Sequence, residues 1–225
     1  SKAIANETSK YGVALTKIDV IYSGLPLDQL PYYAKENEGR TLNIISVGRS
    51  HWKKGYVHAL DAMALLKREK IDFHYTIVGV GDDEALLFQR SQLNLENEVQ
   101  FLEYLPFEEV KSNIRKADVL LLSSVEEGIA NVVLEAMALG ILVVSTDCGG
   151  MNDVIKDKDN GFLIPIRNPS DMALALQKVA RLSLENYQSI TKAARKTVEQ
   201  QHTIEKMVTD MQSLYEKVLP KINES

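Results

Sequence analysis

The sequence predicts an α/β fold in which a parallel sheet carries helices on both faces and further helices follow at the C-terminal end. Short apolar segments recur along the chain, and most are continuous runs, as expected for strands that are buried on both faces. Stretches with helical periodicity lie between them, and this alternation is typical of βαβ units. After about residue 168 the strand-like segments stop and only helical patterns remain.

The predicted strands are short apolar segments rich in β-branched residues. They are residues 17–24, 42–48, 73–79, 99–105, 118–124, 141–147 and 161–165. Between the first two of them, residues 25–41 form a polar connection that contains proline. We expect no regular element in that connection.

Predicted helices separate the later strands, at residues 55–69, 82–94, 106–117 and 129–140. Acidic residues open the second of these helices, Pro106 occupies a favoured first-turn position in the third, and Gly140 fits a C-terminal cap of the fourth. Three more helices are predicted at residues 168–182, 183–200 and 203–219, and Pro220 is expected to end the last one.

Charge and composition exclude several classes of protein. A formal net charge of −5 argues against a dedicated nucleic-acid binder, which would carry a basic surplus. The single cysteine, Cys148, excludes an internal disulfide framework and a cysteine-rich zinc site, and it makes a reducing, cytoplasmic compartment the expectation. No apolar run approaches the roughly 20 residues that a membrane-spanning helix needs.

Two cations flank the turn between the strand at 42–48 and the helix at 55–69. In open parallel sheets, ligands bind at the carboxyl ends of the strands, where Arg49 and Lys54 stand. Two cations beside a helix start suit a pyrophosphate, which an arginine can hold with two parallel hydrogen bonds. The alternative is that both are solvated surface cations.

Two glutamates eight residues apart mark the helix predicted at 129–140. On one helix, Glu127 and Glu135 would lie about 12 Å apart along the axis, which is too far for an acid–base dyad of the glycosidase kind. Gly128 instead predicts Glu127 in the loop before the helix and Glu135 in its second turn. The two carboxylates then suit separate hydroxyl groups of one polyol ligand. The alternative is an exposed acidic loop followed by a solvated helix glutamate.

Other motifs are weaker. Gly79 and Gly81 form a G-x-G turn after a strand, with Glu103 about 20 residues further on, which allows an NAD-binding interpretation, although Glu84 occupies the place of the third glycine. Trp52 can line the mouth of a cleft or cover the core. The histidines lack metal-ligand spacing, so no metal site is expected. Basic residues within 183–221 are either a solvated face or a weak contact with a membrane surface: Lys192, Arg195, Lys196, Lys206 and Lys217.

Taken together, these motifs resemble one known family. The sequence is similar to the C-terminal, donor-binding, Rossmann-like domain of retaining glycosyltransferases of family 4 (the group 1 glycosyltransferases), which have the GT-B fold. The resemblance covers about residues 15–182. Its most specific part is the element formed by Glu127, seven intervening residues and Glu135. The segments that carry it are residues 47–55, 77–84, 99–106, 123–150 and 159–165.

The resemblance implies a role for each site residue. Arg49 and Lys54 would hold the diphosphate of a nucleotide-sugar, Glu135 would bind the ribose hydroxyls, and Glu127 would be the catalytic-site carboxylate facing the donor sugar. Backbone groups would contact the sugar and phosphate at Gly128, Ile129, Ala130, Asn131 and Val132, and the base at Glu103, Tyr104 and Leu105. Fixed cations and a helix N-terminus would stabilise the leaving diphosphate in place of a metal ion.

The resemblance also implies a division of the chain and a partner for it. Residues 1–16 would be a linker from an N-terminal, acceptor-binding domain that this sequence lacks, 17–182 the donor-binding domain, and 183–225 C-terminal helices. The expected function is metal-independent transfer of a hexose, with UDP-glucose as donor, to a saccharide or glycolipid acceptor in polysaccharide synthesis at the inner face of the membrane. The alternatives are a non-catalytic nucleotide-sugar binding module and an NAD-linked oxidoreductase.

Two departures from the family pattern concern the donor. Where the family usually has an aromatic and a small residue after Glu-Gly, this chain has Ile129, Ala130 and Asn131. Where Gly-Asp-Gly is frequent, it has Gly79, Val80 and Gly81. Both differences bear on which sugar the site would accept.

Overall fold

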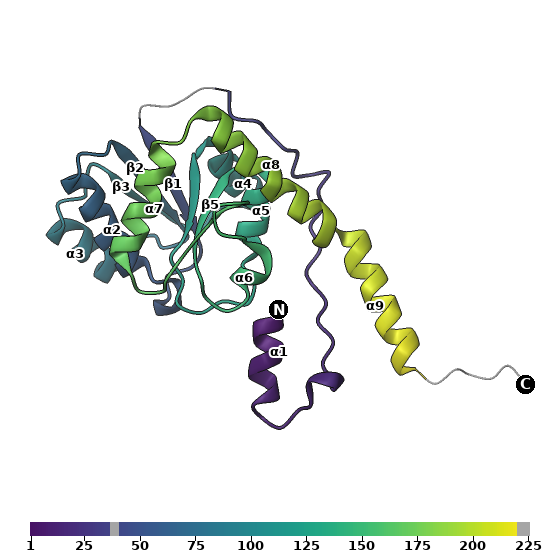
Figure 1. The fold of residues 1–225 in the computed structure, drawn as a ribbon. Helices are drawn as coiled ribbons and strands as arrows, with labels where there is room; N and C mark the ends of the chain where they lie inside the picture. The colour runs from purple at the N-terminus through teal and green to yellow at the C-terminus, as the bar shows by residue number, and fades with distance from the viewer. Residues whose placement is uncertain (37–40, 220–225) are drawn as a thin grey trace, which may run out of the picture.

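The computed structural model of the protein describes residues 1–36 and 41–219. Its sheet is fully parallel, with the strand order β3-β2-β1-β4-β5-β6. The strands are β1 (Leu42–Val47), β2 (Phe73–Val78), β3 (Val99–Leu102), β4 (Val119–Leu122), β5 (Leu142–Thr146) and β6 (Phe162–Ile164). This confirms the predicted α/β class with a Rossmann-like sheet, as Figure 1 shows.

Helices cover both faces of the sheet. They are α2 (Tyr56–Arg68), α3 (Glu84–Gln92), α4 (Phe107–Lys116), α5 (Asn131–Leu139), α6 (Met151–Val154), α7 (Pro169–Ala180) and α8 (Leu184–Gln201). Apolar side chains of α2, α3 and α7 form the core on one face, and those of α4, α5 and α6 form the core on the other, while α8 contributes to both. Burial on both faces explains why the strand segments are continuous apolar runs, such as the fully buried β4.

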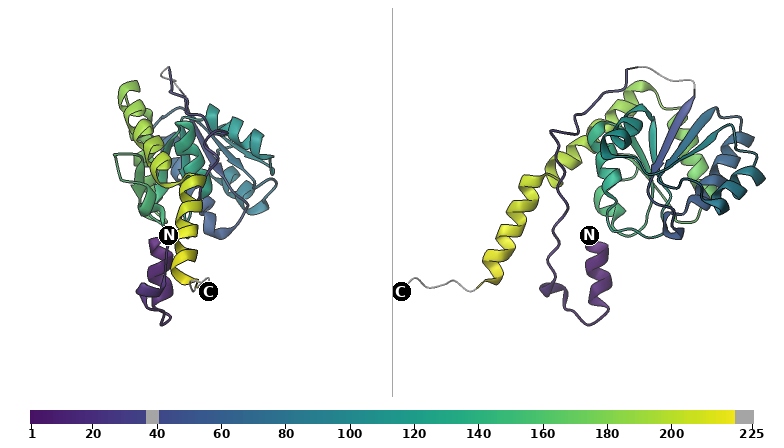
Figure 2. Two further views of the ribbon diagram at one scale, coloured as in Figure 1. Left: turned by 90° about the vertical axis from the view of Figure 1, so that its right-hand side faces the viewer. Right: turned by 180° about the vertical axis from the view of Figure 1, so that it is seen from behind.

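The last helix, α9 (Ile204–Val218), leaves the body of the molecule. None of its residues is buried, and Figures 1 and 2 show it projecting away from the sheet. Apolar side chains nevertheless follow one side of α9, and Ile204, Val208, Met211 and Tyr215 are each at least 37 % exposed. The predicted end of this helix at Pro220 lies outside the described residues.

The strand predicted at 17–24 is wrong. Residues Leu15–Lys17 form a short 3-10 turn, and the chain then runs extended without joining the sheet. At its end it lies against the junction of α8 and α9, where the N–H of Leu25 donates to the carbonyl of His202 at 2.8 Å. The apolar residues at 18–22 are half-buried against other parts of the chain. Their sequence pattern is therefore that of a strand, although the segment pairs with no strand of the sheet.

Two helices were not predicted. Within residues 1–16, the expected linker, Lys2–Ser9 form helix α1, which begins with the Ser1 hydroxyl accepting from the N–H of Ile4. The four-residue α6 follows β5 and is too short to show helical periodicity in the sequence. The predicted strand at 99–105 is also shorter in the structure, because β3 ends at Leu102.

Candidate functional site

The candidate site lies where the strand order reverses. The chain steps outward from β1 to β2 and β3 on one side and from β4 to β5 and β6 on the other, so β1 and β4 are neighbours that begin opposite halves of the sheet. Open α/β sheets bind ligands at the carboxyl ends of two such strands, at the point where the strand order reverses. The loop after β1 carries Arg49 and Lys54, and the loop after β4 carries Glu127.

Lys54 is held at this reversal point by its backbone. It ends the 3-10 turn η2 (Trp52–Lys54), and Gly55 follows with a left-handed φ of 64°. A Cβ atom at Gly55 would lie 2.2 Å from the Ser123 carbonyl oxygen, so a larger residue does not fit. The Ser123 hydroxyl also donates to the Lys54 carbonyl at 2.7 Å. The turn therefore sits directly on the end of β4.

The side chain of Lys54 reaches Glu127. Their Nζ and Oε1 atoms are 2.6 Å apart, and the two side chains are only 22 % and 17 % exposed. The Ser124 hydroxyl donates to the same Oε1 atom at 2.9 Å. The cation predicted for a diphosphate and the carboxylate predicted for a sugar are therefore in direct contact, although 73 residues separate them in the sequence.

Glycines after β5 shape the backbone on which Glu127 stands. Gly149 has a φ of 56°, and a Cβ atom there would lie 1.6 Å from the Glu127 carbonyl oxygen. The N–H of Gly150 donates to the Gly128 carbonyl at 2.7 Å. The loop after β5 is thus layered on the Glu127 loop. Sequence analysis did not assign Ser124 or Gly149 to the site; for Gly149 the only signal was the pair of adjacent glycines.

Helix α5 places the second glutamate as predicted. The helix begins at Asn131, so Glu135 is in its second turn and Glu127 precedes it. Glu135 is half-buried, and burial raises the pKa of its carboxyl. Among the described residues it has no hydrogen-bond or ion-pair partner. A carboxylate that is partly removed from water without a partner is open to hydroxyl donors from a ligand.

The start of α5 is uncapped. Ala130 provides no side-chain hydrogen bond at the N-terminus. No acceptor within the described part of the chain binds the N–H groups of Asn131 and Val132. Free N–H groups and the positive end of the helix dipole favour an anion at this position.

Arg49 is not brought into the cluster. It is exposed, and no residue of the described ranges forms an ion pair or hydrogen bond with it. Next to it, the Ser50 hydroxyl donates to Asp83 of the loop after β2. That bond, followed by the N–H of Leu86, lowers the pKa of the Asp83 carboxyl. The backbone around Arg49 is therefore fixed while its side chain is free.

The G-x-G turn after β2 does not present its N–H groups to a ligand. Those of Gly79, Val80 and Gly81 all point to the Leu102 carbonyl, at 2.9, 3.2 and 3.1 Å. The turn also follows β2 and not a strand at the reversal point. A dinucleotide phosphate needs such N–H groups free, so the NAD-binding interpretation fails on the geometry of this turn.

The residues predicted to contact a base follow β3. Glu103 and Tyr104 are exposed, the latter by 86 %, while Leu105 is half-buried against the core. A Cβ atom at Gly81 would come within 3.4 Å of the Glu103 side chain. The loops after β2 and β3 are therefore adjacent, and the Tyr104 side chain is turned to solvent.

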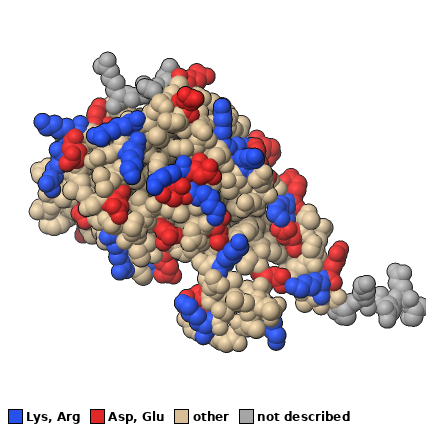
Figure 3. Space-filling view, in the orientation of Figure 1, with Lys and Arg blue, Asp and Glu red and all other residues tan. Residues whose placement is uncertain are grey.

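The basic residues of the C-terminal helices are mixed with acidic ones. On the face that Figure 3 shows, basic and acidic side chains are interspersed over α8 and α9. Arg195 donates to the carbonyls of Leu30 and Ala138 at 2.6 and 2.8 Å, so it has a structural role. Lys206 and Lys217 are paired with aspartates. No helix of the described residues is both long and apolar enough to cross a bilayer.

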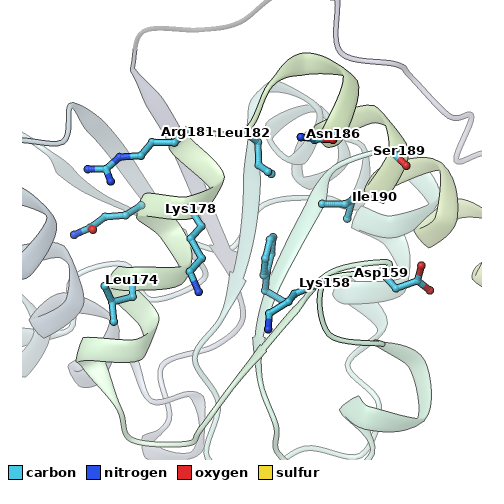
Figure 4. Close-up of a pocket in the computed structure, with 11 residues that line it drawn as sticks. Lys158, Asp159, Leu174, Lys178, Arg181, Leu182, Asn186, Ser189 and Ile190 are labelled. Carbon is cyan, nitrogen blue, oxygen red and sulfur yellow. The ribbon is translucent and has the colours of Figure 1, made fainter.

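A groove lies away from these loops. It has a volume of about 690 Å³ and runs between α7 and α8 beside β6. Figure 4 shows Lys178 on α7, Arg181 directly after this helix, Lys158 on the loop before β6, and Ile190 on α8. None of the residues predicted for the site lines this groove.

The described residues hold no group of three or more His, Cys, Asp or Glu side chains arranged for a metal ion. The absence of a metal requirement therefore stays a prediction. A parallel α/β domain with a lysine–carboxylate pair and an open helix N-terminus at its reversal point has the features of a nucleotide-binding domain.

Comparison with known proteins identifies the family. The model of the family described as "Glycosyl transferases group 1" matches residues 34–197, and the chain belongs to this family. It is 30 % identical over 221 residues to a putative colanic acid biosynthesis glycosyltransferase of Salmonella typhimurium, covering 95 % of this chain and 54 % of that protein. It is 32 % identical over 177 residues to an amylovoran biosynthesis glycosyltransferase of Erwinia amylovora, covering 76 % and 44 %.

Solved structures confirm the predicted GT-B type of fold. A glycosyltransferase from Rickettsia africae superposes with a TM-score of 0.87 at 21 % identity, over 98 % of this chain and 62 % of that one. Anabaena HepE, solved in complex with UDP-glucose, gives a TM-score of 0.82 at 21 % identity, over 97 % and 62 %. The chain thus spans about half the length of the curated relatives that it matches.

Proposed function

We propose that this chain is the donor-binding part of a glycosyltransferase that moves a hexose from a nucleotide-sugar to a saccharide or glycolipid acceptor. UDP-glucose is the proposed donor, and the reaction proceeds with retention and without a metal ion. The observation that carries the proposal is the Lys54–Glu127 pair at the reversal point of the sheet, beside the uncapped start of α5. Family membership and the UDP-glucose complex of HepE support it.

Each group then has a task on the donor. Lys54 and the first N–H groups of α5 bind the diphosphate, while Glu135 accepts hydrogen bonds from the ribose hydroxyls. Glu127, released from Lys54, accepts hydrogen bonds from the donor sugar. Arg49 turns inward to the diphosphate when the donor is present, since its exposed side chain has no ion pair or hydrogen bond with any described residue to hold it outside.

The chemistry follows from these positions. The bond between the anomeric carbon and the diphosphate oxygen breaks, and its electron pair stays on the leaving diphosphate. An acceptor hydroxyl oxygen bonds to the same carbon on the same face, and its proton passes to the diphosphate. Negative charge grows on the leaving group in this step, so Lys54 and the helix N-terminus bind it more strongly in the transition state than in the ground state.

We also propose that an additional domain completes this enzyme. The exposed apolar side of α9, formed by Ile204, Val208, Met211 and Tyr215, has no partner within the described residues. An exposed apolar stripe of this kind marks a contact surface. We assign it to an acceptor-binding domain of the same protein.

Calorimetric titration with UDP, GDP, ADP and NADH, with and without EDTA, tests the proposal. We expect one nucleoside diphosphate to bind and EDTA to leave its affinity unchanged, while NADH does not bind. In Lys54→Ala, the affinity for UDP should fall about 10- to 100-fold, the loss of one charge-assisted hydrogen bond, whereas uridine should bind as before. Equal losses for UDP and uridine would exclude the diphosphate role of Lys54.

A further inference from the structure

Trp52 is an exposed aromatic residue at the rim of the site. It is the only tryptophan of the chain, and 64 % of its surface is open to solvent. This exposure excludes the interpretation that it covers the core. It stands in the same 3-10 turn as Lys54, two residues before it.

The indole has fixed neighbours although it is not buried. The ring of His51 lies 5.7 Å from it, centroid to centroid, with 31° between the ring planes. The Nζ atom of Lys53 is 5.7 Å from its centroid. The N–H of Lys53 in turn donates to Nδ1 of His51 at 3.2 Å. These contacts restrict the indole without removing it from solvent.

The turn that bears Trp52 is also tied to the Glu127 loop. The N–H of Val125 donates to the Lys53 carbonyl at 2.7 Å, and the Lys53 ammonium pairs with Glu126 at 2.8 Å. Lys53–Glu126 therefore forms an outer, more exposed pair beside the inner pair of Lys54 and Glu127. The indole, the Lys53 ammonium and the carboxylate of Glu126 are therefore neighbours.

We propose that Trp52 binds the saccharide acceptor by stacking on one of its pyranose rings, with Lys53 and Glu126 bonding the hydroxyl groups at the rim of that ring. This inference rests on the proposed transferase function. A pyranose has one face of C–H groups and an edge of hydroxyls, so it fits an aromatic plane flanked by a donor and an acceptor. A rigid aromatic ring also supplies contact area at a small cost in conformational entropy.

The position of Trp52 separates the proposed acceptor contact from the donor site. Diphosphate binding needs Lys54 and the start of α5, which the inner pair and the helix N-terminus provide. Trp52 lies outside that pair, on the solvent side of the same loop. A sugar stacked on it would stand beside the Lys54–Glu127 pair, where an attacking hydroxyl can approach Glu127.

Because the chain has one tryptophan, its fluorescence reports on this contact directly. We would titrate the 225-residue protein, saturated with UDP, with maltose, lactose and the methyl glycosides of glucose, galactose, mannose and rhamnose. At least one saccharide should change the intensity and the emission maximum in a saturable way. The absence of any saturable change across this panel would overturn the inference.

Variants test whether the Trp52 ring is responsible for saccharide binding, which is here measured by calorimetry. Trp52→Ala should weaken the saccharide about tenfold, as expected for the loss of one aromatic stack, and Trp52→Phe should restore part of the affinity. UDP affinity should not change in either variant. Phe88→Ala is the matched control, since Phe88 is 67 % exposed on α3, and it should affect neither ligand. Equal saccharide binding by wild type and Trp52→Ala would also overturn the inference.

The two proposals fail in different ways. UDP binding without a saccharide response would leave the donor function intact and remove Trp52 from the acceptor site. Calorimetric binding of a saccharide that is lost in Trp52→Ala, measured without UDP in a protein that binds no nucleoside diphosphate, would keep the stacking contact and remove the donor function.

Discussion

The pairing of Lys54 with Glu127 predicts that removing a charged residue of the candidate site raises the affinity for UDP. In the structure the lysine is bonded to a carboxylate of its own chain at 2.6 Å, so a diphosphate must displace that carboxylate before it can bind. The same carboxylate also repels the phosphates. Glu127→Gln keeps an acceptor for the Ser124 hydroxyl but removes both obstacles. We therefore expect this variant to bind UDP more tightly than wild type.

The size of the gain follows from the burial of the pair. Exposed ion pairs contribute about 0.2–1 kcal/mol. The side chains of Lys54 and Glu127 are 22 % and 17 % exposed, so the upper end applies. Releasing about 1 kcal/mol corresponds to about fivefold in affinity. UDP-glucose should gain less than UDP, because the variant also loses carboxylate contacts to the sugar hydroxyls.

Calorimetry on a double-mutant cycle measures this coupling. On the Lys54→Ala background no ammonium is left to release, so only the part of the gain from Glu127→Gln that comes from relieved repulsion should remain. Thermal unfolding of each variant checks that the fold is retained. If Glu127→Gln bound UDP with unchanged or lower affinity, the diphosphate would not be competing with this carboxylate for Lys54, and the proposed exchange of partners would be refuted.

Two further predictions concern the loops that support the site. Gly149→Ala should lower the free energy of unfolding by about 2–4 kcal/mol, because its Cβ would meet the Glu127 carbonyl at 1.6 Å. The control is Gly12→Ala, which has nothing within 4 Å and should cost only about 1 kcal/mol for its positive φ. Urea denaturation compares the two variants, and equal losses would contradict the clash. Asp83 has a folded-state pKa below its unfolded value, mainly because of Ser50, so its stabilisation is complete above the unfolded pKa and disappears as pH falls through the folded one. The difference in urea midpoint between wild type and Asp83→Asn should shrink on acidification, and a difference that grew in acid would contradict this assignment.

Most of the sheet could be predicted because burial on both faces leaves a clear pattern. The segments at 42–48 and 141–147 match β1 and β5 within a residue at each end. The false strand at 17–24 has the same β-branched, apolar character, but it packs against the junction of α8 and α9. Local sequence reports that a segment is apolar and extended, and it does not report whether another strand lies beside it.

The sequence predicted which residues belong to the candidate site, but not which of them contact one another. The loop and helix positions of Glu127 and Glu135 followed from Gly128, which lies in the loop between β4 and α5. The bond between Lys54 and Glu127 depends on β1 and β4 being neighbours, which no local pattern of the sequence encodes. Ser124 was missed for the same reason: a serine at a strand end becomes informative only when its acceptor is known.

The two glycine-containing turns show what decides where a phosphate can bind. After β2, the N–H groups of the G-x-G turn are all used by the Leu102 carbonyl, because β3 ends directly beside that turn. At the start of α5, neither a side chain nor a neighbouring strand end takes up the N–H groups of Asn131 and Val132. The G-x-G turn that matches a dinucleotide pattern thus has no free N–H groups for a phosphate, while the start of α5, which lacks a glycine fingerprint, has them. Free N–H groups bind an anion, so the position of the neighbouring strand end, and not the number of glycines, distinguishes the two turns.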